Sequence, residues 1–146
     1  MKKRLGFYTL FYLLLFYLVG CSALSPDSSS ASFVDISPIE AKRKIEMKRD
    51  VLILDVRTQE EFSQGHIEGA INIPVQEIEK MIGELRKYKK YEIIVYCRSG
   101  NRSRRASEIL VRYGFKNVYN LKGGFIEWSK TIMEGEDEKD HKRYNN

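Results

Sequence analysis

The sequence of 146 residues has little of the residue types that build two common kinds of small protein. It contains two cysteines, two histidines and one tryptophan. Two cysteines cannot form the disulfide framework that holds many small secreted domains together. Two histidines and two cysteines, scattered along the chain, argue against a metal site, so we expect no metal. The two cysteines are Cys21 and Cys97.

The longest apolar run lies at the start of the chain. A basic head at residues 2–4 precedes an uncharged stretch at residues 5–19, which is short for a membrane-spanning helix of ~20 residues. A basic head, a short apolar run and a small residue before Cys21 are typical of a secretory signal. We expect residues 1–20 to be a signal peptide, with an uncleaved membrane anchor as the alternative.

The residues "LVGC" at positions 18–21 resemble the lipobox of bacterial lipoproteins. This resemblance implies that Cys21 carries lipid and that the signal is cut just before it. Residues 21–32 would then be the lipidated cysteine and a Ser-rich tether, and the protein would lie in the cell envelope, anchored to a membrane and facing outside the cytoplasm. Loss of three positive charges with the signal leaves a net charge near +2, which gives no support to a nucleic-acid partner.

The middle of the chain alternates between strand and helix patterns. This alternation predicts an α/β domain at residues 33–133, with a parallel sheet and helices on both faces. Residues 134–146 are charged and lack apolar periodicity, so we expect a disordered tail. The expected strands are 33–37, 50–57, 69–74, 91–97 and 117–124, and the expected helices are 37–48, 58–65, 76–88, 102–113 and 125–133.

Cys97 closes a strand and opens the loop "CRSGNRS", residues 97–103. A thiol is nucleophilic only as the thiolate, and the ordinary pKa of cysteine is ~8.5. Gly100 and Asn101 tolerate the positive φ angles with which successive N–H groups can point at one sulfur. The positive end of the following helix favours the same anion, as would the charges of Arg98 and Arg102. The loop therefore predicts an ionised Cys97 in a cradle that also binds anions, although an inert buried cysteine is the alternative.

Three stretches together resemble a single-domain rhodanese, a thiosulfate sulfurtransferase. They are "LILDVRTQEEFSQGHIEGAINIP", "IIVYCRSGNRS" and "NLKGGFIEW", which occur in the family's order and span about residues 34–132. The resemblance implies a five-stranded parallel sheet and no cofactor. It implies that Cys97 takes sulfur from a small anionic donor as a persulfide and passes it to a thiol or to cyanide. The acceptor would be a small thiol or a thioredoxin-like protein.

The resemblance also implies roles for single residues. The backbone amides of Arg98, Ser99, Gly100, Asn101, Arg102 and Ser103 would cradle the outer sulfur, and the side chains of Arg98 and Arg102 would steer the donor. Asp55 and Arg57 would support the site, with a structural ion pair as the alternative for both.

Three other functions stay open at this point. A related cysteine phosphatase or arsenate reductase would have an arginine six positions after the cysteine, where this chain has Ser103. A thiol redox protein would need a second, resolving cysteine. A non-catalytic rhodanese-like module would bind an anion or a protein; many such modules lack the loop cysteine, which this chain keeps.

Overall fold

The computed structural model describes residues 32–47 and 50–144. The predicted signal peptide at residues 1–20, the lipidated Cys21 and the tether up to residue 31 lie outside the described residues. Within the described ranges, the structure holds no helix with the length and apolar character needed to cross a membrane.

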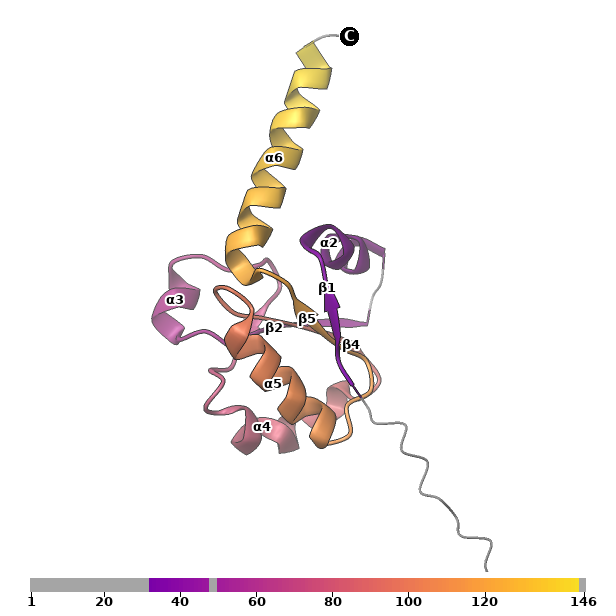
Figure 1. Cartoon of the computed structure of the whole chain (residues 1–146), viewed down its shortest axis with the longest axis vertical. Helices are drawn as coiled ribbons and strands as arrows, with labels where there is room; N and C mark the ends of the chain where they lie inside the picture. The colour runs from indigo at the N-terminus through magenta and orange to yellow at the C-terminus, as the bar shows by residue number, and fades with distance from the viewer. Residues whose placement is uncertain (1–31, 48–49, 145–146) are drawn as a thin grey trace, which may run out of the picture. The chain divides into compact units, whose positions relative to one another are not determined.

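The described part of the chain contains one sheet of five parallel strands in the order β1-β5-β4-β2-β3. This confirms the predicted fold class. Figure 1 labels β1, β2, β4 and β5. The middle strands are apolar almost throughout because both of their faces are covered. The strands are β1 (Val34–Ile36), β2 (Val51–Asp55), β3 (Ile71–Asn72), β4 (Glu92–Tyr96) and β5 (Val118–Leu121).

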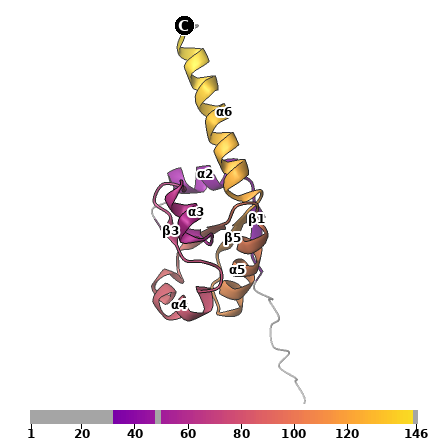
Figure 2. The same cartoon turned by 90° about the vertical axis from the view of Figure 1, so that its left-hand side faces the viewer.

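Helices cover both faces of the sheet. Figure 2 shows α2 above the sheet and α4 and α5 below it. The helices are α2 (Pro38–Met47), α3 (Gln59–Ser63), α4 (Ile78–Leu85), α5 (Asn101–Arg112) and α6 (Gly124–Tyr144), with a short 3₁₀ helix η1 (Arg86–Tyr88) after α4. Capping residues set some of these starts: Ser37 and Glu40 exchange hydrogen bonds before α2, and Thr58 and Glu61 form a capping box at α3.

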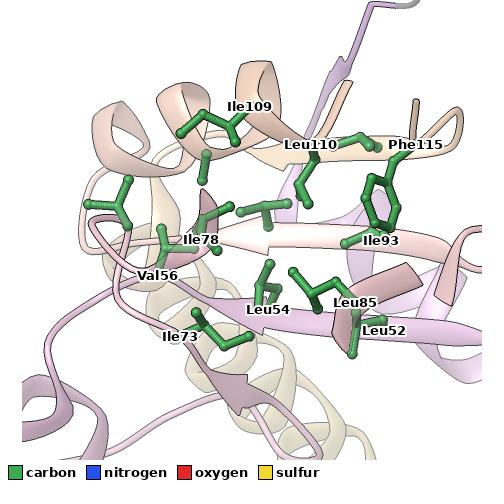
Figure 3. Packing of buried hydrophobic residues seen from close by; sticks show 14 of the residues in the cluster. Leu52, Leu54, Val56, Ile73, Ile78, Leu85, Ile93, Ile109, Leu110 and Phe115 are labelled. Carbon is green, nitrogen blue, oxygen red and sulfur yellow. The ribbon is translucent and has the colours of Figure 1, made fainter. Parts of the chain in front are cut away.

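The core is divided by the sheet into two apolar clusters. Side chains alternate along β2, so that Leu52 and Leu54 face one layer while Ile53 faces the other. The larger cluster joins the sheet to α4 and α5, and Figure 3 shows Ile109 and Leu110 over Leu54 and Ile93. The smaller cluster joins the sheet to α2 and the first turns of α6. These layers fix the carboxyl ends of β2 and β4 side by side.

Residues 134–144 are helical, although the sequence predicted a disordered tail at residues 134–146. Helix α6 continues without a break to Tyr144. Its first turns are anchored because Phe125 and Trp128 pack against the smaller core cluster. Once a helix is nucleated, adding good helix formers such as Glu and Lys costs little, and the tail contains no proline. The end of α6 is therefore helical although its sequence has no apolar face.

Candidate active site

Cys97 directly follows β4 at the carboxyl edge of the sheet, and α5 begins four residues later. Strand β4 lies between β2 and β5, so this loop emerges at the middle of the sheet. In open α/β sheets, ligands bind at this edge. Cys97 is the free cysteine of the described residues, and its side chain is only 1% exposed. The residue singled out by the sequence is thus a buried thiol at the usual place for a site.

The loop after Cys97 surrounds the sulfur with hydrogen-bond donors. The N–H of Gly100 donates to Cys97 Sγ at 3.1 Å, and the Ser103 hydroxyl oxygen lies 3.6 Å from the same sulfur. The backbone N–H groups of Ser99 and Ser103 also lower the pKa of Cys97. Gly100 has a φ of +102°, a conformation that glycine adopts without strain, and this turn directs the amides inward. Asn101 is the exposed first residue of α5.

Helix α6 holds the carbonyl side of the same loop. The N–H of Phe125 donates to the Cys97 carbonyl at 2.8 Å, and that of Ile126 donates to the Arg98 carbonyl at 3.2 Å. This close approach needs Gly124, whose φ is +59°, because a Cβ there would overlap the Cys97 carbonyl oxygen and the Arg98 backbone. The carbonyls of Cys97 and Arg98 therefore point to α6, while the amides that follow point to the sulfur.

These contacts decide the protonation of the thiol. Burial is the largest single influence and by itself raises the pKa of Cys97. The hydrogen bonds from the Ser103 hydroxyl and from the amides of Ser103, Ser99 and Gly100 together outweigh burial, so that the pKa of Cys97 lies below its ordinary value. The sulfur is stabilised as an anion mainly by neutral donors, whereas the sequence predicted these donors together with the charges of Arg98 and Arg102.

The side chain of Arg102 is held in an ion pair. Its guanidinium forms two hydrogen bonds, at 2.7 and 2.8 Å, with the carboxylate of Glu61 in α3. The hydrogen bond from Arg102 is the largest cause that lowers the pKa of Glu61, to about 2. Arg102 still interacts electrostatically with Cys97. The pair ties α3 to the start of α5 and partly neutralises the charge that was predicted to steer a donor.

Asp55 and Arg57 form a buried ion pair beside the loop. Arg57 Nη2 lies 2.6 Å from Asp55 Oδ2 and donates to the Gly65 carbonyl at 2.7 Å. The guanidinium of Arg57 lies 4.4 Å from the centre of the Phe125 ring. Asp55 is fully buried and Arg57 is 4% exposed, so the pair is first of all a structural element. It fixes the loop after α3 against the first turn of α6.

A cavity of about 400 Å³ opens next to this pair. It is lined by Arg57, Glu61, Gln64, Gly65, Arg98 and Phe125. Arg98, the residue after Cys97, is exposed. The cavity therefore brings together the predicted residues Arg57 and Arg98 beside the cysteine loop. Among residues 32–47 and 50–144, no cluster of three His, Cys, Asp or Glu side chains could hold a metal ion.

The structure adds two residues that the sequence did not single out, Asn120 and Asp35. Asn120 in β5 is 3% exposed, and its Oδ1 accepts the Ser103 hydroxyl at 2.6 Å. Its Nδ2 donates to Asp35 in β1 at 2.7 Å. Asn120 belongs to the "NLKGG" stretch, and a polar residue inside an apolar strand was the available signal. Its partners come from two other elements, which no local pattern identifies.

These features define a class of protein: a parallel α/β domain that presents a buried cysteine with a lowered pKa, in an amide-lined loop at the carboxyl edge of its sheet. The family model described as rhodanese-like domain matches residues 37–131. The chain belongs to the rhodanese-like domain family.

Individual relatives agree with this assignment. A protein of Allochromatium vinosum named sulfurtransferase is 40% identical over 81 residues, which cover 56% of this chain and 74% of that protein. The crystal structure of a rhodanese-like domain protein from Staphylococcus aureus has a TM-score of 0.60 and 31% identity, and the match covers 66% of this chain and 91% of that one. These relatives support sulfur transfer in general.

The same domain also occurs within a larger enzyme. The tRNA uridine(34) hydroxylase of Buchnera aphidicola is 36% identical over 97 residues, which cover 64% of this chain but only 31% of the hydroxylase. Proteins with different named activities therefore share this domain, and membership of the family does not by itself identify the substrate.

Proposed function

We propose that this chain is a sulfurtransferase that moves sulfane sulfur from thiosulfate or a similar small anion to a thiol or to cyanide through a persulfide on Cys97. The observation that carries the proposal is the set of N–H groups, from Ser99, Gly100 and Ser103, that converge with the Ser103 hydroxyl on one buried sulfur. Such a cradle favours the thiolate and does not require a general base to take the proton of the thiol.

In the first half-reaction, the Cys97 thiolate attacks the outer sulfur of thiosulfate. A bond forms between Sγ and that sulfur, and the S–S bond of thiosulfate breaks with its electron pair leaving on sulfite. The electron pair of the thiolate forms the new bond, the outer sulfur carries the negative charge of the persulfide, and sulfite leaves as a dianion, so total charge and atoms are conserved. The amides of the loop are then available to the new anionic sulfur.

In the second half-reaction, an acceptor thiolate or cyanide attacks the outer sulfur of the persulfide. The bond between that sulfur and Sγ breaks, its electron pair returns to Cys97, and the acceptor leaves as a persulfide or as thiocyanate. The acceptor would be a small thiol or a protein thiol of the thioredoxin-like kind. Each half-reaction uses the same sulfur atom, which predicts a ping-pong mechanism.

The surroundings of the loop favour an anionic donor. Arg98 is exposed and lines the cavity together with Arg57. The charge of Arg57 is balanced by Asp55, and that of Arg102 by Glu61. Arg98 is therefore the side chain that we expect to attract the donor, with its positive charge acting over a Debye length of ~10 Å in ordinary buffer.

The test is mass spectrometry of the full chain after incubation with thiosulfate, together with measurement of sulfite. We expect one additional sulfur atom on Cys97, one sulfite released per chain, and removal of the extra sulfur by cyanide. Cys97→Ser should show none of these changes. If the unchanged chain gains no sulfur and releases no sulfite, the alternative of a non-catalytic module that binds an anion or a protein replaces the proposal.

We also propose that the domain is held at a membrane, facing outside the cytoplasm, by lipid on Cys21. The support is the basic head, the short apolar run and the "LVGC" stretch of the sequence. Several acyl chains would give firm anchoring. Cys21→Ala should block lipidation and cleavage of the signal, which gel mobility and detergent partition would report. Normal processing of that variant would exclude the lipobox.

A further inference from the structure

A chain of hydrogen-bonded polar groups runs from the buried cysteine to Asp35, which is exposed at the edge of the sheet. Ser103 in α5 lies beside Cys97, Asn120 in β5 lies behind Ser103, and Asp35 in β1 lies behind Asn120. Ser103 is fully buried and Asn120 nearly so. Asp35 also pairs with Arg104 at 2.7 Å nearer the surface. Buried polar groups that connect across three elements usually fix one another's orientation.

The direction of each hydrogen bond in this chain can be deduced. A carboxylate only accepts, so the Asn120 atom that faces Asp35 is its amide nitrogen. The Asn120 oxygen therefore faces Ser103, and at 2.6 Å it accepts the hydroxyl hydrogen. The hydrogen bond from Asn120 is also the largest cause that lowers the pKa of Asp35, which keeps Asp35 ionised and the orientation fixed.

This orientation puts Asn120 in competition with the cysteine. The Ser103 hydroxyl has one hydrogen and three acceptors within reach: the Asn120 oxygen, the Gly100 carbonyl oxygen at 3.0 Å and Cys97 Sγ at 3.6 Å. The Gly100 carbonyl already accepts the Arg104 amide at 3.1 Å. When Cys97 is ionised, the hydroxyl can turn to the sulfur only by giving up its short bond to Asn120.

We propose that Asn120, held by Asp35, is a positioning residue that limits how strongly the Ser103 hydroxyl stabilises the thiolate of Cys97. A less stabilised thiolate is a better nucleophile, because nucleophilicity falls as a thiol becomes more acidic. The inference rests on the proposed function only in taking Cys97 as the nucleophile. Asn120 acts through Ser103 and need not touch the substrate.

Other charged groups face Cys97 and must be kept constant in a test. Arg102 on α5 interacts with the sulfur, Glu61 on α3 pairs with Arg102, and Arg98 and Arg57 lie at the adjoining cavity. Guanidinium groups keep their charge across any pH at which a thiol titrates. None of these residues is changed in the variants below, so their contribution is the same in each.

The test is the rate of alkylation of Cys97 by iodoacetamide as a function of pH, measured on the full chain. Asn120→Leu should move the midpoint to lower pH. Below the midpoint of the unchanged protein, the thiolate fraction should rise about three- to ten-fold, which corresponds to one hydrogen bond of ordinary strength, so the rate should rise about two- to five-fold. The plateau at high pH should fall about two-fold, since the more stable thiolate is less nucleophilic. An unmoved midpoint, or one at higher pH, would overturn the proposal.

The Ser103→Ala background separates positioning from a merely structural role. Ser103→Ala alone should move the midpoint to higher pH, and Asn120→Leu should have no further effect in that background. An equal shift with and without the Ser103 hydroxyl would contradict the proposal. The matched control is Ser107→Ala, one turn further along α5, because the buried Ser107 hydroxyl has no hydrogen-bond partner among the described residues. It should leave the midpoint unchanged.

If Asn120→Leu does not fold, Asp35→Asn tests the same competition for the Ser103 hydroxyl. Without a carboxylate to fix it, the Asn120 amide can reverse and offer its nitrogen to Ser103, which frees the hydroxyl hydrogen for the sulfur. The midpoint should again move to lower pH, and the part that disappears in the Ser103→Ala background measures positioning. A shift that persists there in full would be electrostatic and would overturn the proposal. Alkylation needs no sulfur donor, so a failure of persulfide formation remains a separate result.

Discussion

Replacement of Gly124 by alanine tests whether α6 holds the cysteine loop in its active shape. The backbone of Gly124 has a φ of +59°, and a Cβ there would overlap the Cys97 carbonyl oxygen and the backbone of Arg98. To relieve the overlap, α6 must move away from the loop. That movement lengthens the hydrogen bonds from the Phe125 and Ile126 amides to the carbonyls of Cys97 and Arg98.

The expected loss of stability follows from these contacts. A left-handed backbone costs an alanine about 1–2 kcal/mol. Two weakened hydrogen bonds add about 1 kcal/mol each, so the free energy of unfolding of Gly124→Ala should fall by about 3–4 kcal/mol. Since domains of this size have about 5–15 kcal/mol to lose, the variant should still fold. Its loop carbonyls would no longer be held, and the pKa of Cys97 should rise.

The matched control is Gly69→Ala. Gly69 has a similar φ of +76°, but a Cβ at that position meets nothing within 4 Å. It therefore isolates the cost of the backbone conformation, about 1–2 kcal/mol, and should leave the cysteine unaffected. Urea unfolding gives the stability of both variants. The pH midpoint of alkylation and the yield of Cys97 persulfide from thiosulfate report on the loop.

Comparison of Gly124→Ala with Gly69→Ala shows whether α6 holds the cysteine loop. If Gly124→Ala costs no more than Gly69→Ala, α6 adapts to the added methyl group and the close approach is unimportant. If it costs more but leaves the alkylation midpoint and persulfide yield unchanged, the loop keeps its shape without α6. Either result would refute the view that the contact between α6 and the loop determines the acidity of Cys97.

Three further predictions concern the charged residues around the loop. Glu61→Gln should lower the free energy of unfolding by about 1 kcal/mol near neutral pH, because its partly exposed pair with Arg102 is lost. Since the pKa of Glu61 falls from 4.5 to about 2, this contribution is complete above about pH 4.5 and disappears as the pH drops toward 2; a gap that stays constant in acid-unfolding curves would disprove it. Arg98→Ala should raise KM for thiosulfate about three- to ten-fold with little change in kcat, and the difference should shrink in 0.5 M salt, roughly as screening requires; an effect on kcat alone would assign Arg98 to the chemical step. Asp55→Asn should lower the free energy of unfolding by about 3 kcal/mol, measured with urea, because it removes the carboxylate partner of the buried Arg57. A loss below about 1 kcal/mol would show that the hydrogen bond to the Gly65 carbonyl is sufficient to stabilise Arg57.

The sequence predicted the architecture because its signals are local. The central strands β2 and β4 are mostly apolar runs, and most helices carry an apolar face or a capping residue, as at Thr58 and Glu61. The position of Cys97 followed from the rule that ligands bind at the carboxyl edge of parallel sheets. The strand expected at residues 69–74 shrinks to Ile71–Asn72, because the pairing of an edge strand depends on its neighbour more than on its own residues.

The electrostatics of the site could be predicted only in part. The inward amides followed from Gly100, which takes the positive φ that its residue type allows. The pairing of Arg102 with Glu61 could not be predicted, because the two residues lie 41 positions apart and both side chains are also compatible with a position in solvent. The same holds for Asn120, whose partners Ser103 and Asp35 come from different elements. Such pairs are decided by how the elements pack.

The structure also explains why peptide groups, more than arginines, stabilise the charge on the sulfur. Arg57, Arg102 and Arg104 each pair with a carboxylate, so their charge is largely balanced where it stands. The amides of the loop carry no counterion and keep their direction because α6 fixes the carbonyls of Cys97 and Arg98. A persulfide places its charge one bond further out than a thiolate does. Several fixed dipoles spread along a loop can follow that displacement, whereas a single guanidinium paired with an acid cannot, so a sulfur carrier benefits from an amide cradle more than from a nearby cation.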